Sequence, residues 1–401
     1  MLKTMNSSQR NEVVRQCLVG LRTGAVIGLV VLGAACPQVL GQAAPPTTKP
    51  AAAKPAATAP AATKPAAAGT PAKAAPAVQP AAAPAETPKT ATPPAKRAGP
   101  TKADTGKVDP KEEPPPPPES LVLRTKDGWN IFYTFYGPKK GVRPGKSVVP
   151  LIMLHGWQGQ GSEYAELATI LQSWGFASIV PDLRGHGRSL NVIRRMPNVE
   201  EEDKVVKAEE LTPQDLEGMV NDVEAMKRVL VEKNNNAELN IEMLTVIAAD
   251  LGTLVALNWS AMDWSWPVMP AFKQGQDVKA LVLLTPKQTF KRLNANTALN
   301  HPAISRRLSI LIAVGDQQPR DLSEAKRIHS RLERIRPPVA AEDRLQKQDL
   351  FLIPAPTPLQ STKLLDRALP VGGSIMRFLE LRLLRKLEDF PWTERKNPLG
   401  G

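Results

Sequence analysis

Cysteine and histidine are scarce in this sequence. The 2 cysteines, Cys17 and Cys36, both lie near the N-terminus, and only 4 histidines occur in 401 residues. Beyond residue 36 the chain has no thiol, which excludes disulfides and cysteine-based metal sites there. The sequence also lacks metal-ligand spacing, a phosphate-binding loop and a dinucleotide fingerprint. We therefore expect no metal and no cofactor.

Aromatic and large apolar residues are almost missing from residues 44–118, where alanine, proline, lysine and threonine dominate. Of the 40 prolines in the chain, 20 lie between Pro45 and Pro118. Such a segment cannot bury enough apolar surface to offset the entropy of ordering its backbone. We expect a disordered linker that acts as a spacer or, through its lysines, attaches to an anionic envelope polymer.

A concentrated basic surface is missing too, although the net charge is +13. Residues 1–118 carry 14 Lys or Arg against 6 Asp or Glu, and residues 119–401 carry 38 against 33. The excess positive charge is spread along the linker, with no basic face of the kind that contacts phosphates. The sequence predicts no nucleic-acid partner.

The N-terminus has the pattern of a secretory signal. A polar segment with basic residues precedes an apolar run from Ala25 to Ala35, and Gly41 and Ala43 are the small residues of a cleavage site. The run is shorter than the ~20 residues of a transmembrane helix. For residues 1–43 three outcomes stay open: cleavage after Ala43, lipidation of Cys36, which follows Gly-Ala-Ala as in a bacterial lipobox, and an uncleaved membrane anchor. Each predicts an exported domain, periplasmic or at the cell surface, with the membrane contacted only through this segment.

Residues 119–401 alternate apolar runs with amphipathic helices, which predicts an α/β domain with a mostly parallel eight-stranded sheet flanked by helices. Thr212 is expected to cap a long helix that ends at Asn234, after a polar surface loop over residues 191–210. The eight predicted strands are Leu121–Arg124, Ile131–Tyr136, Val148–Leu154, Phe176–Val180, Ile241–Ala248, Val278–Leu284, Ser309–Val314 and Asp349–Ile353.

Two motifs in this domain resemble the α/β-hydrolase superfamily. One is His155-Gly156-Trp157 and the other is the segment PDLRGHGRS over residues 181–189. The resemblance covers residues 119–401 and implies the α/β-hydrolase fold, without a large cap domain. It also implies an oxyanion hole formed by the backbone N–H groups of Trp157 and Leu251, the second of which follows the nucleophile position.

The nucleophile position departs from the family pattern. Where the family has Gly-x-Ser-x-Gly, this chain has Ala248-Ala249-Asp250-Leu251-Gly252, so that Asp250 replaces the serine. Haloalkane dehalogenases and epoxide hydrolases of the family use an aspartate nucleophile, which forms an alkyl ester. They still need a histidine to activate the water that hydrolyses this ester.

The other two catalytic positions depart as well. After the last strand, Thr357 and Pro358 stand where the family's histidine belongs, and no histidine follows His329. His301, in the loop over residues 286–306, is the candidate substitute for the base. Gln318 occupies the family's acid position, and Asp316, two residues earlier, either supplies the acid or caps the following loop.

The loss of all three positions favours an exported, non-catalytic pseudoenzyme that binds a ligand or assembles in the cell envelope. Its small-molecule ligand is expected in a pocket above Asp250. The alternative is a hydrolase of ester, epoxide or haloalkane-type bonds with Asp250 in the nucleophile position. A cluster of Trp259, Trp264 and Trp266 at the opposite end of the domain is either packing or an aromatic platform for a ligand.

Overall fold

The strands form one eight-stranded sheet, which confirms the predicted fold class. The computed structural model describes residues 113–194, 202–269 and 273–395. The segment 1–43 and nearly all of the predicted linker lie outside these residues, so the expectations for them stay predictions. The sheet contains β1 (Glu119–Arg124), β2 (Asn130–Tyr136), β3 (Pro150–Leu154), β4 (Ala177–Pro181), β7 (Leu244–Ala249), β8 (Val278–Leu284), β11 (Ser309–Gly315) and β12 (Leu350–Ala355).

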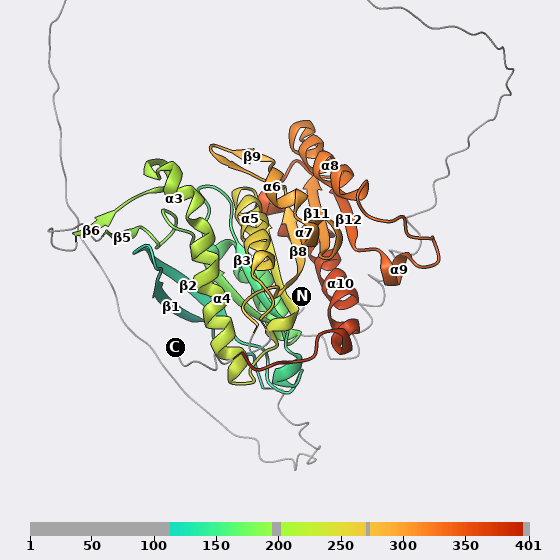
Figure 1. Cartoon of the computed structure of the whole chain (residues 1–401), viewed down its shortest axis with the longest axis horizontal. Helices are drawn as coiled ribbons and strands as arrows, with labels where there is room; N and C mark the ends of the chain where they lie inside the picture. The colour runs from blue at the N-terminus through green and yellow to red at the C-terminus, as the bar shows by residue number, and fades with distance from the viewer. Residues whose placement is uncertain (1–112, 195–201, 270–272, 396–401) are drawn as a thin grey trace, which may run out of the picture. The chain divides into compact units, whose positions relative to one another are not determined.

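The strand order is β1-β2-β4-β3-β7-β8-β11-β12 (Figure 1). The pairs β1–β2 and β2–β4 are antiparallel, and every other pair is parallel. The central strands β3, β4, β7 and β11 are buried at each residue, because helices cover both faces of a parallel sheet. The carboxyl ends of β3, β7, β8, β11 and β12 therefore meet at one edge of the sheet.

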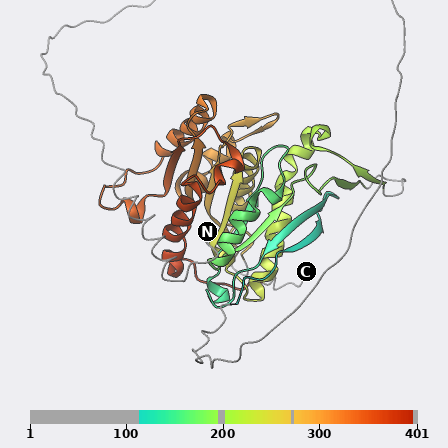
Figure 2. The same ribbon diagram turned by 180° about the vertical axis from the view of Figure 1, so that it is seen from behind.

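Helices cover the sheet on two faces. The longer ones are α2 (Ala165–Ser173), α4 (Met219–Asn235), α5 (Leu251–Ser265), α8 (Pro319–Glu333) and α10 (Val371–Arg382). One face packs against α4, α5 and α8, and the other packs against α2 and α10, as the front and back views show (Figures 1 and 2). The two faces of the sheet pack into two hydrophobic cores. Alternate residues of β3 lie in each, with Ile152 and Leu154 in one core and Leu151 and Met153 in the other. No helix of the described residues is long and apolar enough to cross a membrane.

Three predicted segments differ in detail. The long helix breaks at Gly218 into α3 (Pro213–Glu217) and α4, although Thr212 caps it as expected and accepts a hydrogen bond from the N–H of Asp215. The predicted surface loop over residues 191–210 contains the hairpin strands β5 (Asn191–Arg194) and β6 (Glu202–Val205), because the buried side chain of Val192 packs into the core.

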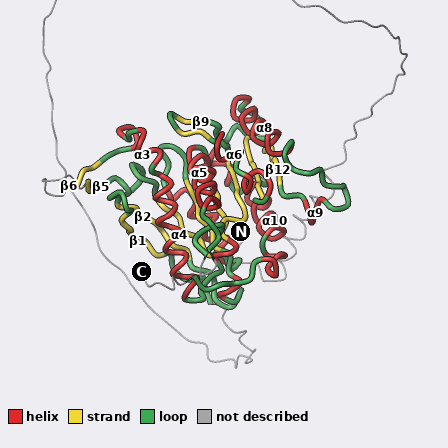
Figure 3. The backbone as a smooth tube through the Cα atoms, viewed as in Figure 1, coloured by secondary structure: helices red, strands yellow, loops and turns green. Residues whose placement is uncertain are grey.

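The loop over residues 286–306 is the third such segment, and most of it forms short strands and helices (Figure 3). It contains β9 (Thr289–Phe290), β10 (Leu293–Asn294), α6 (Asn296–Asn300) and α7 (Pro302–Arg306). These elements are short, and together with the turns that join them they form the connection between β8 and β11. In agreement with the prediction, this connection holds no large cap domain.

Candidate functional site

Asp250 lies on a sharp turn between β7 and α5, at the carboxyl edge of the sheet. Its backbone has φ 47° and ψ −116°, a conformation that costs a residue with a side chain about 1–3 kcal/mol. The turn is held by hydrogen bonds from the N–H of Asp250 to the carbonyl of Leu284 (3.0 Å) and from the Thr253 hydroxyl to the carbonyl of Asp250 (2.6 Å). Surrounding contacts therefore impose the strained backbone.

Two glycines allow the turn to approach β3 closely. A Cβ at Gly252 would lie 2.6 Å from the carbonyl oxygen of His155 and 2.7 Å from that of Leu154. A Cβ at Gly156 would lie 2.9 Å from the Cβ of Asp250. These distances are too short for a residue with a side chain, so the close contact requires glycine at both positions.

The Asp250 carboxylate lies against the predicted oxyanion hole. The backbone N–H of Trp157 donates a 3.2 Å hydrogen bond to Oδ2 of Asp250. Leu251, whose N–H is the second predicted donor, follows directly as the first residue of α5. The structure therefore brings Asp250, Trp157 and Leu251 together, and the carboxylate itself uses the Trp157 donor.

Lys287 and Asp321 complete a charged group that sequence reasoning missed. Nζ of Lys287 lies 3.7 Å from Oδ1 of Asp250 and 2.6 Å from Oδ1 of Asp321. The Thr253 hydroxyl accepts the backbone N–H of Lys287 at 3.2 Å, which fixes this segment beside the turn. Lys287 closely follows the strand β8 and Asp321 lies in the first turn of the helix after β11. The only signal in the sequence is that each follows a predicted strand, whose carboxyl ends meet at one edge of the sheet.

The loop after β12 places Ser361 beside Asp250. A Cβ at Gly156 would meet Oγ of Ser361 at 3.0 Å as well as the Asp250 side chain. The Thr285 hydroxyl accepts the N–H of Ser361 (2.8 Å) and donates to Oε1 of Gln360 (2.8 Å). Thr357, one of the two residues predicted at the histidine position, is buried and accepts the N–H of Leu359 within its own loop.

A short hairpin covers the Trp157 ring. Phe290 of β9 lies 4.9 Å from it between ring centroids, and Nζ of Lys291 lies 4.1 Å from its centroid. The ring of His186 contacts it edge-on at 5.1 Å. Trp157 is therefore fixed on several sides, which also fixes the N–H that it directs at Asp250.

The two motif histidines hold loops together. His155 is fully buried, with Nδ1 2.8 Å from the carbonyl of Gly156 and Nε2 accepting the N–H of Leu183 at 2.9 Å. Burial and the neighbouring His186 lower the pKa of His155 to about 4, so its ring is neutral. Nδ1 of His186 lies 2.9 Å from the carbonyl of Arg184. Neither imidazole contacts Asp250 in these hydrogen bonds.

His301 does not reach Asp250, which corrects its prediction as a substitute base. Its Nδ1 accepts the N–H of Ala303 at the start of α7, and Nε2 lies 3.4 Å from Oγ of Ser265. Ser265 is the last residue of α5 and Asp250 directly precedes the first, a separation of roughly 20 Å along the helix axis. The connection after β8 returns along α5, so only its first part, including Lys287, stays near the turn.

Asp316 is not joined to Asp250 by any hydrogen bond or ion pair among the described residues. Its side chain is exposed, and its N–H donates to the carbonyl of Ala355. Gln318, at the expected acid position, is the residue before α8. The acid that does approach Asp250, through Lys287, is Asp321.

The site therefore consists of two carboxylates bridged by one ammonium group, one backbone donor and nearby hydroxyls. The last of the 4 histidines, His329, lies on α8 beside Glu333, so the chain supplies no imidazole to Asp250. No group of three or more His, Cys, Asp or Glu within the described ranges is placed to hold a metal ion. Such an arrangement can bind a polar group, but it offers no paired nucleophile and base.

Comparison with known proteins agrees with this architecture. Residues 149–330 match the family model for the alpha/beta hydrolase fold. A non-heme chloroperoxidase of Streptomyces lividans is 37% identical over 68 residues, which are 17% of this chain and 22% of that protein. The chain thus matches about a fifth of the length of this curated relative.

Solved structures of similar fold have low sequence identity. An esterase of Pyrococcus furiosus has 13% identity and a TM-score of 0.45, over 67% of this chain and 91% of its own. A dienelactone hydrolase of Anabaena variabilis has 14% identity and a TM-score of 0.43, over 66% and 99%. On the family match over residues 149–330, the strand order and the turn at Asp250, the chain has the α/β-hydrolase fold.

Proposed function

We propose that this chain is an exported α/β-hydrolase-like protein of the cell envelope that binds a ligand or assembles with a partner and does not catalyse hydrolysis. The observation that carries the proposal is the state of the Asp250 carboxylate. It accepts the N–H of Trp157 and lies 3.7 Å from the ammonium group of Lys287. The carboxylate therefore occupies a donor that the family uses for the oxyanion, and its other oxygen faces an ammonium group.

The missing base supports the same conclusion. An aspartate that attacked a substrate would form an ester, and release of the product would then need a water molecule activated by a base. The imidazole rings of the chain contact other groups, and the ammonium group of Lys287 lies against two carboxylates. An ester on Asp250 would therefore accumulate instead of turning over.

One observation favours hydrolysis as the alternative. The strained backbone at Asp250 is the geometry of a nucleophile turn, and the side chain is 23% exposed and so reachable from solvent. The substrates would be esters, epoxides or haloalkanes, attacked by the Asp250 carboxylate.

Turnover by the purified full-length chain separates the two functions. The substrates are short- and medium-chain p-nitrophenyl esters, a small epoxide and a small haloalkane, and the variants are Asp250→Asn and Asp316→Asn. We expect no rate above buffer for any of the three proteins. Turnover that Asp250→Asn abolishes and Asp316→Asn keeps would overturn the proposal, because Asp316 is exposed and is not joined to Asp250.

Export is a separate part of the proposal, and the supporting pattern is the basic segment followed by the apolar run from Ala25 to Ala35. The mature mass tests it after expression in a bacterial host and fractionation. A chain that begins at Ala44, or one with lipid on Cys36, supports export. A chain that begins at Met1 and lies in the cytoplasmic fraction would contradict it.

A further inference from the structure

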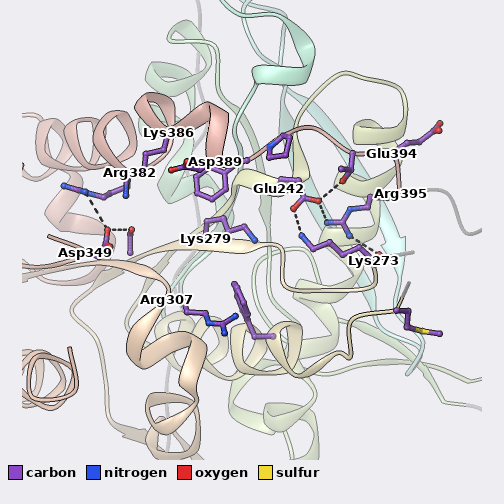
Figure 4. A pocket seen from close by; sticks show the side chains of 16 residues that line it. Glu242, Lys273, Lys279, Arg307, Asp349, Arg382, Lys386, Asp389, Glu394 and Arg395 are labelled. Atoms are coloured by element: carbon purple, nitrogen blue, oxygen red, sulfur yellow. Dashed lines mark hydrogen bonds and ion pairs between the residues drawn. The ribbon is translucent and has the colours of Figure 1, made fainter. Parts of the chain in front are cut away.

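A cavity of about 700 Å³ opens at the end of the sheet opposite to Asp250 (Figure 4). Its walls include Glu242, just before β7, Lys279 at the start of β8, Ser309 at the start of β11, and Asp349, just before β12. Asp250 follows the last residue of β7, so the length of the strands separates the cavity from Asp250. The cavity is of the size that binds small molecules in proteins, typically ~300–1,000 Å³.

Several charges around the cavity are already paired. Lys273 and Arg395 form ion pairs with Glu242 and with Asp277. Arg382 donates to the carbonyls of Leu345 and Gln346 and lies 3.7 Å from Asp349. The charges of these paired side chains largely cancel, so they add little net charge to the wall of the cavity.

Three other cations of the wall have no carboxylate within ion-pair distance among the described residues. They are Lys279, Arg307 and Lys386. Nζ of Lys279 contacts the carbonyl of Gln276 at 2.5 Å, and the Arg307 side chain lies against an aromatic ring. The carboxylates of Asp389 and Glu394 also line the cavity, but both residues are exposed to solvent. With these two included, six Lys or Arg and four Asp or Glu line the cavity, so the wall as a whole has an excess of positive charge.

Trp264 provides a flat apolar surface close to two of these cations. Its ring centroid is 5.0 Å from Nζ of Lys279 and 5.6 Å from Cζ of Arg307. Its indole N–H donates to the carbonyl of Val278 at 2.9 Å, which fixes the orientation of the ring. The cavity therefore presents a rigid aromatic face with positive charge around it, as in sites that bind aromatic anions.

Two buried donors of the wall have no acceptor within the part of the chain that the structure describes. They are the Nε–H groups of Arg382 and Arg395, whose side chains are 1% and 4% exposed. Buried donors without acceptors are uncommon in folded proteins, because each costs free energy. An anion bound in the cavity adds acceptor oxygens in this part of the molecule.

We propose that this cavity is a binding site for a small aromatic phosphate monoester, with its phosphate held by Lys279 and Arg307 and its ring against Trp264. Arginine and lysine are the usual partners of phosphate, and three unpaired cations match a ligand with about two negative charges. The site is independent of Asp250 and of any hydrolysis there.

The state of Lys279 adds a pH signature. Burial, followed by the charge of Lys273, lowers the pKa of Lys279 from 10.5 to about 8, although the carboxylates of Glu242, Asp277 and Asp263 act in the opposite direction. A bound phosphate favours the charged ammonium group. The affinity for the anion should therefore be highest below pH 8 and should fall as the pH rises through 8.

Titration calorimetry of the full-length chain with phenyl phosphate at pH 7 tests the proposal. We expect Lys279→Met and Arg307→Gln each to weaken binding at least about tenfold. Arg143→Gln should change it less than about twofold, since Arg143 lies over the ring of Phe176 at the same 5.6 Å but does not line the cavity. Arg307 is exposed, so its variant should fold, and circular dichroism checks each protein.

Neutral and inorganic analogues complete the test. Phenol and inorganic phosphate should each bind at least about tenfold more weakly than phenyl phosphate, and affinity for phenyl phosphate should decrease between pH 7 and pH 9. The proposal is overturned by no binding at about 10 mM phenyl phosphate, by equal affinity of the Arg307→Gln variant, or by equal affinity for phenol or inorganic phosphate.

Discussion

At the scale of single residues, Asp250 combines backbone strain with a carboxylate whose two oxygens both face neighbouring donors. Its φ of 47° places the side chain against Gly156, where Trp157 and Lys287 meet it. Strain of this kind persists only where the surrounding structure imposes it, and it occurs mainly at functional sites. The chain has therefore kept the backbone of a nucleophile turn while losing its serine.

The strain predicts an unusual order of stabilities at position 250. Asp250→Gly should be more stable than Asp250→Ala by about 1 kcal/mol, because only glycine adopts a positive φ without strain, even after its larger unfolded-state entropy is counted. Both variants lack the carboxylate, so the difference isolates the backbone. Urea denaturation measures it. At Lys326, exposed in the middle of α8, alanine should instead be the more stable by about 1 kcal/mol. Equal free energies of unfolding for Asp250→Ala and Asp250→Gly would contradict the claim that the backbone at this position is strained.

Contiguous motifs made part of the site predictable. Asp250, Trp157 and Leu251 follow from short segments whose order along the chain places them at one strand edge. Lys287, Asp321 and Ser361 come from three separate connections, and only the register of β8, β11 and β12 brings them together. His301 failed as a prediction because its distance from Asp250 depends on the path of the chain after β8.

At the scale of elements, one hydroxyl joins the turn to the connection after β8. Thr253 in α5 donates to the carbonyl of Asp250 and accepts the N–H of Lys287. Gln360 joins β12 to β8 and β11 in a similar way, with hydrogen bonds to Thr285 and to the backbone of Gly315. These side-chain hydrogen bonds hold three connections at fixed positions around the site.

Removal of the Thr253 hydroxyl should therefore be costly. Thr253→Val leaves the partly buried N–H of Lys287 without its acceptor and should lower the free energy of unfolding by about 1–3 kcal/mol. Thr169 on α2 also donates to a carbonyl of its own helix, but it is exposed, so Thr169→Val should change stability by less than about 0.5 kcal/mol. Urea denaturation measures the free energy of unfolding of both variants. An equal decrease in Thr253→Val and Thr169→Val would show that the hydroxyl of Thr253 has no special role.

At the scale of the whole molecule, the sheet separates two regions of different character. The carboxyl edge holds Asp250 and its neighbours, and the opposite edge holds the cationic cavity around Trp264. The eight strands and the helices between them were predictable because long apolar runs have few alternatives once both faces of a sheet are covered. The cavity was not predictable, since the residues around it come from strand starts and from the C-terminal segment.

The buried histidine should give the whole fold an acid-sensitive stability. The pKa of His155 is about 4 in the folded chain, against about 6.5 in an unfolded one, because burial disfavours its charged form and His186 adds to this. Between pH 6.5 and pH 4 the unfolded chain binds a proton that the folded chain does not. The contribution of neutral His155 to the free energy of unfolding is fully present above pH 6.5. It is lost as the pH falls, by up to about 3 kcal/mol at pH 4.

Urea denaturation between pH 7 and pH 4 checks this contribution. The decrease in unfolding free energy should be smaller in His155→Gln than in the wild type, although the variant is less stable at pH 7. The partly exposed His329 provides the matched control, and His329→Gln should keep most of the decrease. A wild-type decrease that persists unchanged in His155→Gln would assign the acid sensitivity to other groups.

The most direct test of the account is the mass of the intact full-length chain after incubation with a small bromoalkane and, separately, with a small epoxide. An aspartate that acts as a nucleophile without a base to hydrolyse its ester would retain the alkyl group, so even a single attack would be detected. We predict that the mass does not change on incubation, as for Asp250→Asn treated in the same way, because the carboxylate is engaged by Trp157 and Lys287. A mass increase that maps to Asp250 and is absent from Asp250→Asn would contradict the account and establish Asp250 as a reactive nucleophile.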